Sequence, residues 1–340
     1  MSTTKYLYAF ATLTLLFIVS VFINVNVGSI NIPFSDIWHS FTNPTLVDKN
    51  YQYIITQYRF PKTITSILTG IGLGVSGLLM QTFFRNPLAG PFVLGISSGA
   101  SLGVALMIMG GSLLGISSFL HYFSIPLAAC LGAFLVLSVV MISAKKIKNT
   151  LSILIIGLMF GSFTTAMISI LSYFSTATEL QQYIFWSFGS LSNLQWSEIA
   201  LLTAIVSFSC FGLLFIIKPL DALLLGENYA KSLGISISKT QTFIFIITSL
   251  LTGSITAFVG PIAFIGLAIP HISKLIFTTS NHRILIPAVA VIGALVMLWC
   301  DTISHIPLSG KNLPINAITS LLGAPVVIWL LLSKSNRIHS

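Results

Sequence analysis

Apolar segments of about the length of a bilayer crossing recur along almost the whole chain, and they constrain its fold more than any other feature. They lie at residues 6–26, 62–82, 92–110, 121–143, 150–172, 199–217, 240–259, 262–277, 284–302 and 316–332. A helix needs about 20 residues to cross the hydrocarbon core, with a range of about 17–25. The segment at 262–277 is short and directly follows Pro261, so its boundaries are the least well defined.

The composition excludes a soluble fold. Of the 340 residues, 55% are hydrophobic and 7% are charged, whereas a soluble domain has about 25% charged residues. An outer-membrane barrel would show alternating segments of about 10 residues, which are shorter than most of the apolar segments in this chain. The sequence therefore predicts an all-α polytopic membrane protein with about ten transmembrane helices, formed by residues 1–340 as a single domain.

The distribution of basic residues predicts the orientation of the chain. If the N-terminus is cytoplasmic, 12 of the 16 lysine and arginine residues fall in cytoplasmic segments, as the positive-inside rule requires. Ten crossings then place both termini in the cytoplasm. The apolar run from Tyr6 to Val25 is longer than the apolar part of a signal peptide, so we interpret it as a retained helix. The same rule explains the net charge of +9 without nucleic-acid binding.

Three polar segments are long enough to form surfaces outside the membrane. Residues 27–61 and 173–198 are predicted to be external, and the second contains an amphipathic helix. Residues 218–239 are predicted to be cytoplasmic, with an amphipathic helix over 220–234 that ends at Gly234, because glycine commonly terminates helices. A helix on the cytoplasmic face would contact either the membrane surface or a partner protein.

Small residues recur at helical spacing in two of the apolar segments. We expect close helix packing at Ser66, Gly70, Gly74 and Gly77 in the first segment and at Gly95, Gly99 and Gly103 in the second. This spacing places small residues on one helix face and lets a neighbouring backbone approach closely. Between the two segments, Arg85, Asn86 and Pro87 are too polar for hydrocarbon, and they predict a water-exposed turn on the cytoplasmic side.

A weak similarity links two Gly-Pro segments. Residues 90–95, GPFVLG, resemble residues 260–266, GPIAFIG, which are one residue longer. Each segment follows one apolar helix and opens another. The similarity is explained either by an inverted repeat, which many transporters contain, or by chance.

The sequence lacks the motifs of an enzyme. No GxxxxGK[ST] motif occurs, so the chain is not expected to bind or hydrolyse ATP. Cys130, Cys210 and Cys300 lie in apolar segments without CxxC spacing, and we expect neither a metal site nor a cofactor on this chain. The charged residues Asp301 and Lys274 lie near helix ends, where their side chains can reach the interface.

The scarcity of charge inside the apolar segments bears on the mode of transport. Ion-coupled secondary transporters usually carry acids or ion sites within their membrane helices. Secondary transport of a small solute is therefore the alternative rather than the main hypothesis. Any pathway through this chain would be lined by Ser, Thr, Asn, Gln, Met and small residues.

Four blocks of sequence carry a family resemblance, which extends from about residue 59 to 332. They are Arg59-Phe60-Pro61-Lys62; residues 81–91 with 94–100; residues 226–234; and residues 259–267 with Pro270-His271-Ile272, Leu313-Pro314 and Gly323-Ala324-Pro325. In this order and spacing the chain resembles the FecCD-type permeases, the membrane subunits of ATP-binding-cassette importers for ferric siderophores, haem and vitamin B12. The resemblance implies the fold of the vitamin-B12-importer permease.

The resemblance also implies a cargo and a set of partners. It implies a homodimer, or a heterodimer with a paralogue, in the bacterial inner (cytoplasmic) membrane. Two cytoplasmic subunits would bind ATP and Mg²⁺, and an extracytoplasmic solute-binding protein would deliver the cargo. The expected cargo is an iron chelate, with ferric siderophore first and haem or cobalamin next.

The matching motifs assign roles to particular residues. Coupling to the ATPase is expected at Gly226, Glu227, Ala230, Lys231, Leu233 and Gly234. Docking of the binding protein is expected at Arg59, Lys62 and Lys311, with lipid phosphate as the alternative partner. The family often has arginine where this chain has Lys62, and lysine cannot form the bidentate pair that arginine makes with a carboxylate.

Overall fold

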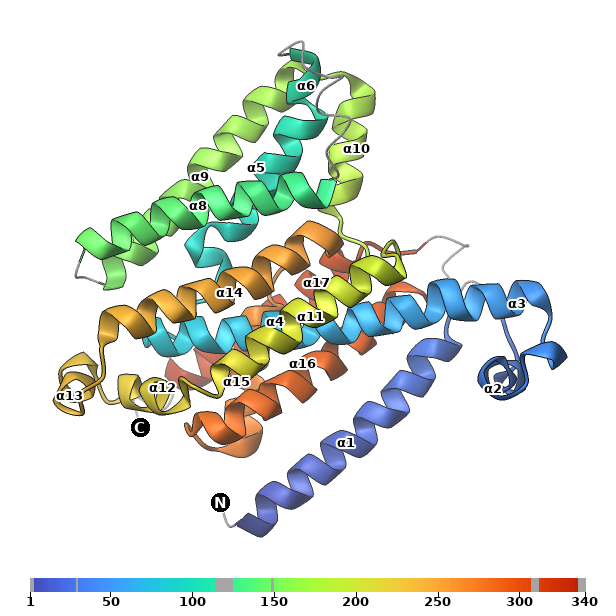
Figure 1. The fold of residues 1–340 in the computed structure, drawn as a ribbon, viewed down its shortest axis with the longest axis horizontal. Helices are drawn as coiled ribbons and strands as arrows, with labels where there is room; N and C mark the ends of the chain where they lie inside the picture. The colour runs from blue at the N-terminus through green and yellow to red at the C-terminus, as the bar shows by residue number, and fades with distance from the viewer. Residues whose placement is uncertain (1–2, 29, 114–124, 148–149, 307–311, 336–340) are drawn as a thin grey trace.

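The computed structural model describes residues 3–28, 30–113, 125–147, 150–306 and 312–335, which form a bundle of helices (Figure 1). The helices are α1 (Thr3–Asn26), α2 (Phe34–Thr42), α3 (Lys49–Ile54), α4 (Phe60–Phe84), α5 (Ile96–Ile108), α6 (Gly110–Leu113), α8 (Ile125–Lys146), α9 (Thr150–Phe174), α10 (Ala177–Ser187), α11 (Trp196–Leu213), α12 (Ile217–Leu224), α13 (Glu227–Ser232), α14 (Ile237–Val259), α15 (Ile265–Phe277), α16 (His282–Ser304) and α17 (Ile315–Ser335). Shorter turns are the 3₁₀ segments η1 (Pro44–Leu46) and η3 (Pro91–Leu94) and the π-helical segment η2 (Ile55–Arg59). Within these ranges the chain has no β-strand, which confirms the all-α prediction.

Each predicted membrane segment corresponds to one helix. Among the described residues, 7 spans are long and apolar enough to cross a bilayer, and they contain α1, α4, α8, α9, α11, α14 and α16. The shorter apolar helices α5, α15 and α17 occupy the remaining predicted positions. The prediction of about ten transmembrane helices is confirmed.

Helix α4 forms the centre of the bundle, where it contacts α11, α14, α15 and α16 (Figure 1). In the most apolar stretch of the span that contains α4, 83% of the residues are buried. The corresponding shares for α1 and α9 are 11% and 17%. Helices α5, α8, α9 and α10 form a second group, which contacts the central group mainly through α14. The peripheral helices α1 and α9 are therefore the ones that present most of their surface to lipid or to partners.

The polar segments gather at two opposite ends of the bundle. The indole Nε1 of Trp196, in the predicted external segment 173–198, donates to the carbonyl of Thr56 in segment 27–61 at 3.2 Å. In Figure 1, α2 and α3 lie at the end opposite α12 and α13, which belong to segment 218–239. These segments lie at opposite ends of the bundle, and their assignment to the two sides of a membrane stays a prediction.

Helix α4 begins earlier than the sequence predicts. The chain is continuously helical from Lys49 to Phe84 through α3, η2 and α4, so the helix extends well before the predicted apolar segment at about 62–82. Pro61 has no N–H, and its ring clashes with the carbonyl four residues earlier in a regular helix. The π-helical segment Ile55–Arg59 lies directly before this proline, and the chain stays helical through both.

The small-residue faces pack as the sequence predicts. A Cβ atom on Gly70 would collide with the backbone of Gly293 in α16, and one on Gly77 would collide with the carbonyl of Gly266 in α15. In the second group, a Cβ atom on Gly99 would collide with the carbonyl oxygen of Gly132 in α8. The predicted close approach of helix backbones is confirmed at these positions. Gly103 is equally close to the backbone of Ala128, whereas Gly74 and Gly95 have their nearest neighbours 3.1 Å from an added Cβ. Ser66 is buried and donates to its own helix.

The two similar Gly-Pro segments meet in space. Each precedes a helix of 13 residues, α5 in one case and α15 in the other. The ring of Pro91 lies against Gly266, and both segments line a cavity of about 300 Å³ that includes Phe92 and Pro261. Their similarity in sequence is therefore matched by a similar structural role, because each leads into a short helix.

Candidate functional site

The predicted polar turn closes the C-terminal end of α4. Arg85 adopts a left-handed conformation, with φ of 47°. The N–H of Asn86 donates to the carbonyl of Gln81 at 3.2 Å, and the N–H of Arg85 donates to that of Thr82 at 3.3 Å. These two bonds form the Schellman pattern that satisfies the last carbonyls of a helix. Arg85 is exposed, and Asn86 and Pro87 are half-buried, so the prediction of an exposed turn is confirmed mainly by Arg85.

The predicted coupling segment is two helices rather than one. Gly226 has φ of 112° and separates α12 from α13, so the prediction of a single helix over 220–234 is wrong. This region of φ strongly favours glycine, which is why the chain turns at this position. The predicted stop at Gly234 is confirmed, because Gly234 has φ of 79° and the N–H of Ile235 donates to the carbonyl of Ala230. Arg85 lies beside Gly226, with Nη1 3.6 Å from the position of a Cβ on that glycine.

An apolar stripe is exposed on this segment. Leu225, Tyr229 and Leu233 are each at least 50% exposed. Tyr229 and Leu233 are four residues apart along α13 and its C-cap, so they lie on one side of that helix, whereas Leu225 precedes the break at Gly226. Exposed apolar clusters outside the membrane indicate a surface for a partner. Leu233 is among the predicted coupling residues, whereas Leu225 and Tyr229 are not, although the four-residue interval between Tyr229 and Leu233 is visible in the sequence.

The remaining predicted coupling residues differ in their exposure to solvent. Lys231 is exposed, and Glu227 is half-buried at the start of α13. Ala230 is completely buried, so its predicted contact with a partner is corrected to a packing role. Its methyl group has no accessible surface, so it packs inside the protein rather than on the exposed side of α13.

At the other end of the bundle, Arg59 is buried rather than exposed. It is only 4% accessible. Its guanidinium donates to the carbonyls of Val25 at 2.9 Å and Asn26 at 2.8 Å, and also to the carbonyl of Ile30. The side chain thus closes the C-terminal end of α1, where a cation stabilises the unpaired carbonyls.

Lys62 is also buried, and it forms an ion pair inside the protein. Its Nζ lies 3.0 Å from Asp301 Oδ2 in α16. Asp301 accepts a further hydrogen bond from Asn24 at 2.7 Å, and His305 Nδ1 lies 3.5 Å from its other oxygen. Thr63 donates to the amide oxygen of Asn24 at 2.7 Å. The expectation that Asp301 reaches the membrane interface is therefore corrected, because the carboxylate is fully enclosed by these partners.

The burial of both cations changes the docking prediction. Arg59 and Lys62 are not exposed charges on the rim, because internal partners already hold them. They line a cavity of about 220 Å³ together with Tyr58 and His305. A docking group would have to enter this cavity to reach either cation. Lys311, the third predicted docking residue, lies outside the described residues.

Helix α9 carries a row of exposed hydroxyl groups. Ser162, Thr165 and Ser169 are exposed and lie on one helix face. Each hydroxyl donates to a carbonyl four residues earlier, at 3.3, 2.9 and 3.0 Å respectively. The sequence analysis expected hydroxyl-bearing residues along a pathway but did not identify this row. Its spacing of three and four residues within 150–172 was the available signal.

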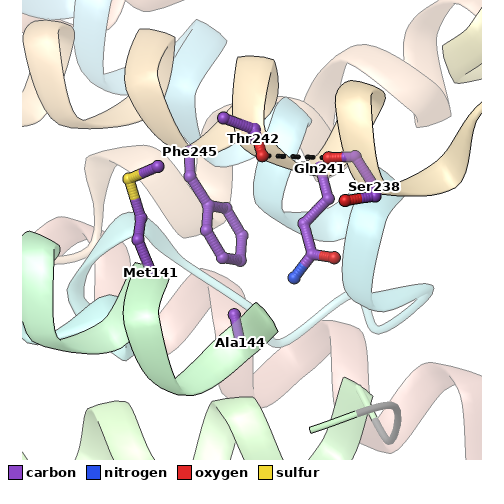
Figure 2. Close-up of a pocket in the computed structure, with 6 residues that line it drawn as sticks. All are labelled: Met141, Ala144, Ser238, Gln241, Thr242 and Phe245. Carbon is purple, nitrogen blue, oxygen red and sulfur yellow. Dashed lines mark hydrogen bonds between the residues drawn. The ribbon is translucent and has the colours of Figure 1, made fainter. Parts of the chain in front are cut away.

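A small cavity lies where α8 of the second helix group meets α14 of the central group. Figure 2 shows Gln241 of α14 extending toward α8, where Met141 and Ala144 lie, beside a cavity of about 20 Å³. The Nε2 of Gln241 is buried without a partner among the described residues. The space is sufficient for about one water molecule. A larger apolar groove of about 680 Å³ also lies between α8 and α14.

The fold and these surfaces define a multi-span membrane permease rather than an enzyme. The FecCD transport family matches residues 16–333, and the chain belongs to this family. Its relatives include the vitamin B12 import system permease protein BtuC of Klebsiella pneumoniae, which is 35% identical over 96% of this chain and 93% of the relative. The BtuC protein of Salmonella typhi is 34% identical over 84% of this chain and 85% of the relative.

Solved structures show the same fold. A metal-chelate type ABC transporter in an inward-facing conformation matches with a TM-score of 0.80 and 28% identity, over 97% of this chain and 99% of the other. PsaBC from Streptococcus pneumoniae, in complex with Fab, matches with a TM-score of 0.56 and 17% identity, over 81% of this chain and 92% of the other. The first match supports the family assignment, and the second shows the fold alone.

Proposed function

We propose that this chain is the membrane subunit of an ATP-driven importer of a metal chelate, with ATP hydrolysis on a separate subunit. The observation that carries the proposal is the exposed stripe of Leu225, Tyr229 and Leu233 on the short helices of a FecCD-family chain. An apolar surface outside the membrane can receive a partner protein. Its position next to Arg85 gives that partner a connection to the end of the central helix α4.

The cargo follows from two lines of support. The motifs resemble those of siderophore, haem and vitamin B12 importers, among which we expected a ferric siderophore first. The curated relatives are named for vitamin B12, and the matching structure is described as metal-chelate type. We therefore propose a metal chelate as the class, with cobalamin and ferric siderophores as the two cargoes to compare first.

The assembly proposed for this function has a homodimer or paralogue heterodimer in the bacterial cytoplasmic membrane, with both termini cytoplasmic. Two ATP-binding subunits would contact α12 and α13. A solute-binding protein would dock at the opposite end, where Arg59 and Lys62 line a cavity. A contact of Lys311 with that protein stays a prediction from the sequence. Such charges guide encounter and orientation more than they raise affinity.

Uptake of labelled compounds tests the proposal. Cells with and without this chain would be given radiolabelled cobalamin, ferric siderophore and haem, each with and without the partner ATPase. We expect ATPase-dependent uptake of one of these chelates. Uptake that persists without the ATPase and is lost when the ion gradient is collapsed would instead support ion-coupled transport. The buried Asp301 gives little support to that alternative, since Lys62 already neutralises it.

Replacing Leu233 with aspartate should uncouple the importer. The change leaves the helix bundle intact, because Leu233 is exposed, but it places a charge in the apolar stripe. We expect ATP hydrolysis to continue and chelate uptake to fall by about tenfold, as for the loss of one apolar anchor at an interface. Leu46→Asp is the control, because Leu46 is also well exposed but lies at the opposite end. Equal uptake by the two variants would contradict coupling through this stripe.

A large side chain on the hydroxyl row of α9 should block passage of the chelate. We propose that Ser162, Thr165 and Ser169 line the path between two subunits. Thr165→Phe is then expected to lower uptake by about tenfold or more, since passage depends on pore diameter. Thr203→Phe on α11 is the matched control, because Thr203 is also exposed and also donates to its own helix. The proposal fails at this row if both variants transport equally in a vesicle uptake assay.

A further inference from the structure

A chain of hydrogen bonds runs from the coupling segment into the centre of the bundle. Asp221 of α12 accepts from His282 at the start of α16, with Nδ1 and Oδ1 2.6 Å apart. The same carboxylate oxygen accepts from the backbone N–H of His282 at 2.9 Å. The other ring nitrogen, Nε2, lies 2.8 Å from the hydroxyl of Thr82 in α4. Three helices that are far apart in the sequence are thus joined by one imidazole ring.

The chemistry of the three groups sets the direction of these bonds. A carboxylate only accepts hydrogen bonds, so Nδ1 of His282 carries a proton. In the neutral ring, Nε2 then accepts from the hydroxyl of Thr82. The ring is therefore held at both nitrogens, and rotation of the imidazole would break both bonds.

Burial differs sharply along this chain of bonds. The side chain of His282 is 1% exposed, whereas that of Asp221 is 39% exposed. Asp221 therefore lies at the surface of the same short helix whose end carries Leu225, and His282 lies in the interior. The carboxylate of Asp221 therefore links the surface of α12 to a buried residue of α16.

The end of α4 that Thr82 occupies is connected to a further helix. Gln81 donates to the carbonyl of Leu267 at 3.0 Å, and its amide oxygen accepts from Lys274 at 3.3 Å, both in α15. Arg85 completes the junction by lying beside Gly226. Helices α4, α12, α15 and α16 are therefore joined by specific polar contacts at one end of the bundle.

We propose that Asp221, His282 and Thr82 are positioning residues that transmit movement of α12 to α4 and α16 during transport. This inference rests on the proposed function, in which the ATPase subunits act on α12 and α13. The bonds are directional and short, so they tie the end of α4 to the start of α16 at a fixed distance from α12. Loss of either bond would let the ATPase cycle move α12 without moving the membrane helices.

The test compares transport with ATP hydrolysis in vesicles that contain the complete importer. The variants are Asp221→Asn and Thr82→Val, of which the second removes one hydroxyl without changing the shape of the side chain. We expect each to lower the number of chelate molecules moved per ATP hydrolysed by about tenfold, a typical strength of coupling between sites. Thr69→Val is the matched control, because Thr69 is buried in the same helix and its hydroxyl has no partner among the described residues.

The outcomes separate the inference from the proposed function. A purely structural role would lower the melting temperature or the amount of assembled importer but would leave the ratio of transport to hydrolysis unchanged, and that result overturns the inference. If Asp221→Asn does not assemble, Thr82→Val decides the matter alone. If the unaltered importer moves no chelate with ATP, the proposed function fails, and the inference fails with it.

Discussion

Replacing Gly77 with alanine is expected to destabilise the protein by about 3 kcal/mol, near the upper end of what overpacking usually costs. The added Cβ atom would collide with the carbonyl of Gly266. A flexible side chain could move aside, but this obstacle is the backbone of α15. Because folded proteins are stable by only about 5–15 kcal/mol, the variant should yield much less folded protein, as measured by thermal unfolding in detergent.

The control for Gly77→Ala is the same change at Gly253. Gly253 is also buried and helical, but the nearest atoms to its added Cβ are 3.6 and 3.8 Å away, at ordinary contact distance. Alanine is favoured over glycine in a helix by about 1 kcal/mol, so Gly253→Ala should be neutral or slightly stabilising. Equal stability of the two variants would contradict the packing of α4 against α15.

Replacing Asp301 with asparagine should be nearly as damaging, for an electrostatic reason. The variant leaves the ammonium of Lys62 buried without a counter-charge. Removing one partner of a buried ion pair typically costs about 3–5 kcal/mol. We expect a large fall in the unfolding temperature of purified protein.

The double variant Lys62→Met with Asp301→Asn should recover most of that loss. Replacing both members of a buried pair by neutral groups is often harmless, because no stranded charge remains. With the unaltered protein and the single variants Lys62→Met and Asp301→Asn, the double variant forms a double-mutant cycle, which isolates the pairwise interaction. Additive destabilisation in the double variant would show that Lys62 and Asp301 do not depend on each other.

Local features of the fold could be predicted with good agreement. The positions of the ten apolar segments follow from hydrophobicity, which each segment carries by itself. The turn at Arg85 and the stop at Gly234 follow from backbone conformations that polar and glycine residues favour. The glycine face of α4 also follows from spacing, since small residues four apart lie on one side of a helix whatever the partner is.

Features that depend on distant contacts could not be predicted. The enclosure of Lys62 requires Asp301 and Asn24, which come from α16 and α1. Ala230 is buried only because α13 folds back on the bundle, so its sequence position gave no indication of it. The link from Asp221 to His282 joins residues 61 positions apart, and neither residue stands in a recognisable motif with the other.

The amino-acid sequence by itself determined that this chain is a helical membrane protein of the FecCD type, where its helices lie, and which helix faces pack closely. These properties depend on hydrophobicity, spacing and backbone preference, which act over a few residues. The tertiary structure alone decided which charges are buried, which apolar side chains remain exposed for a partner, and which helices the coupling segment is bonded to. Those properties depend on the neighbours that each side chain meets, and in this bundle the neighbours come from helices far apart in the chain.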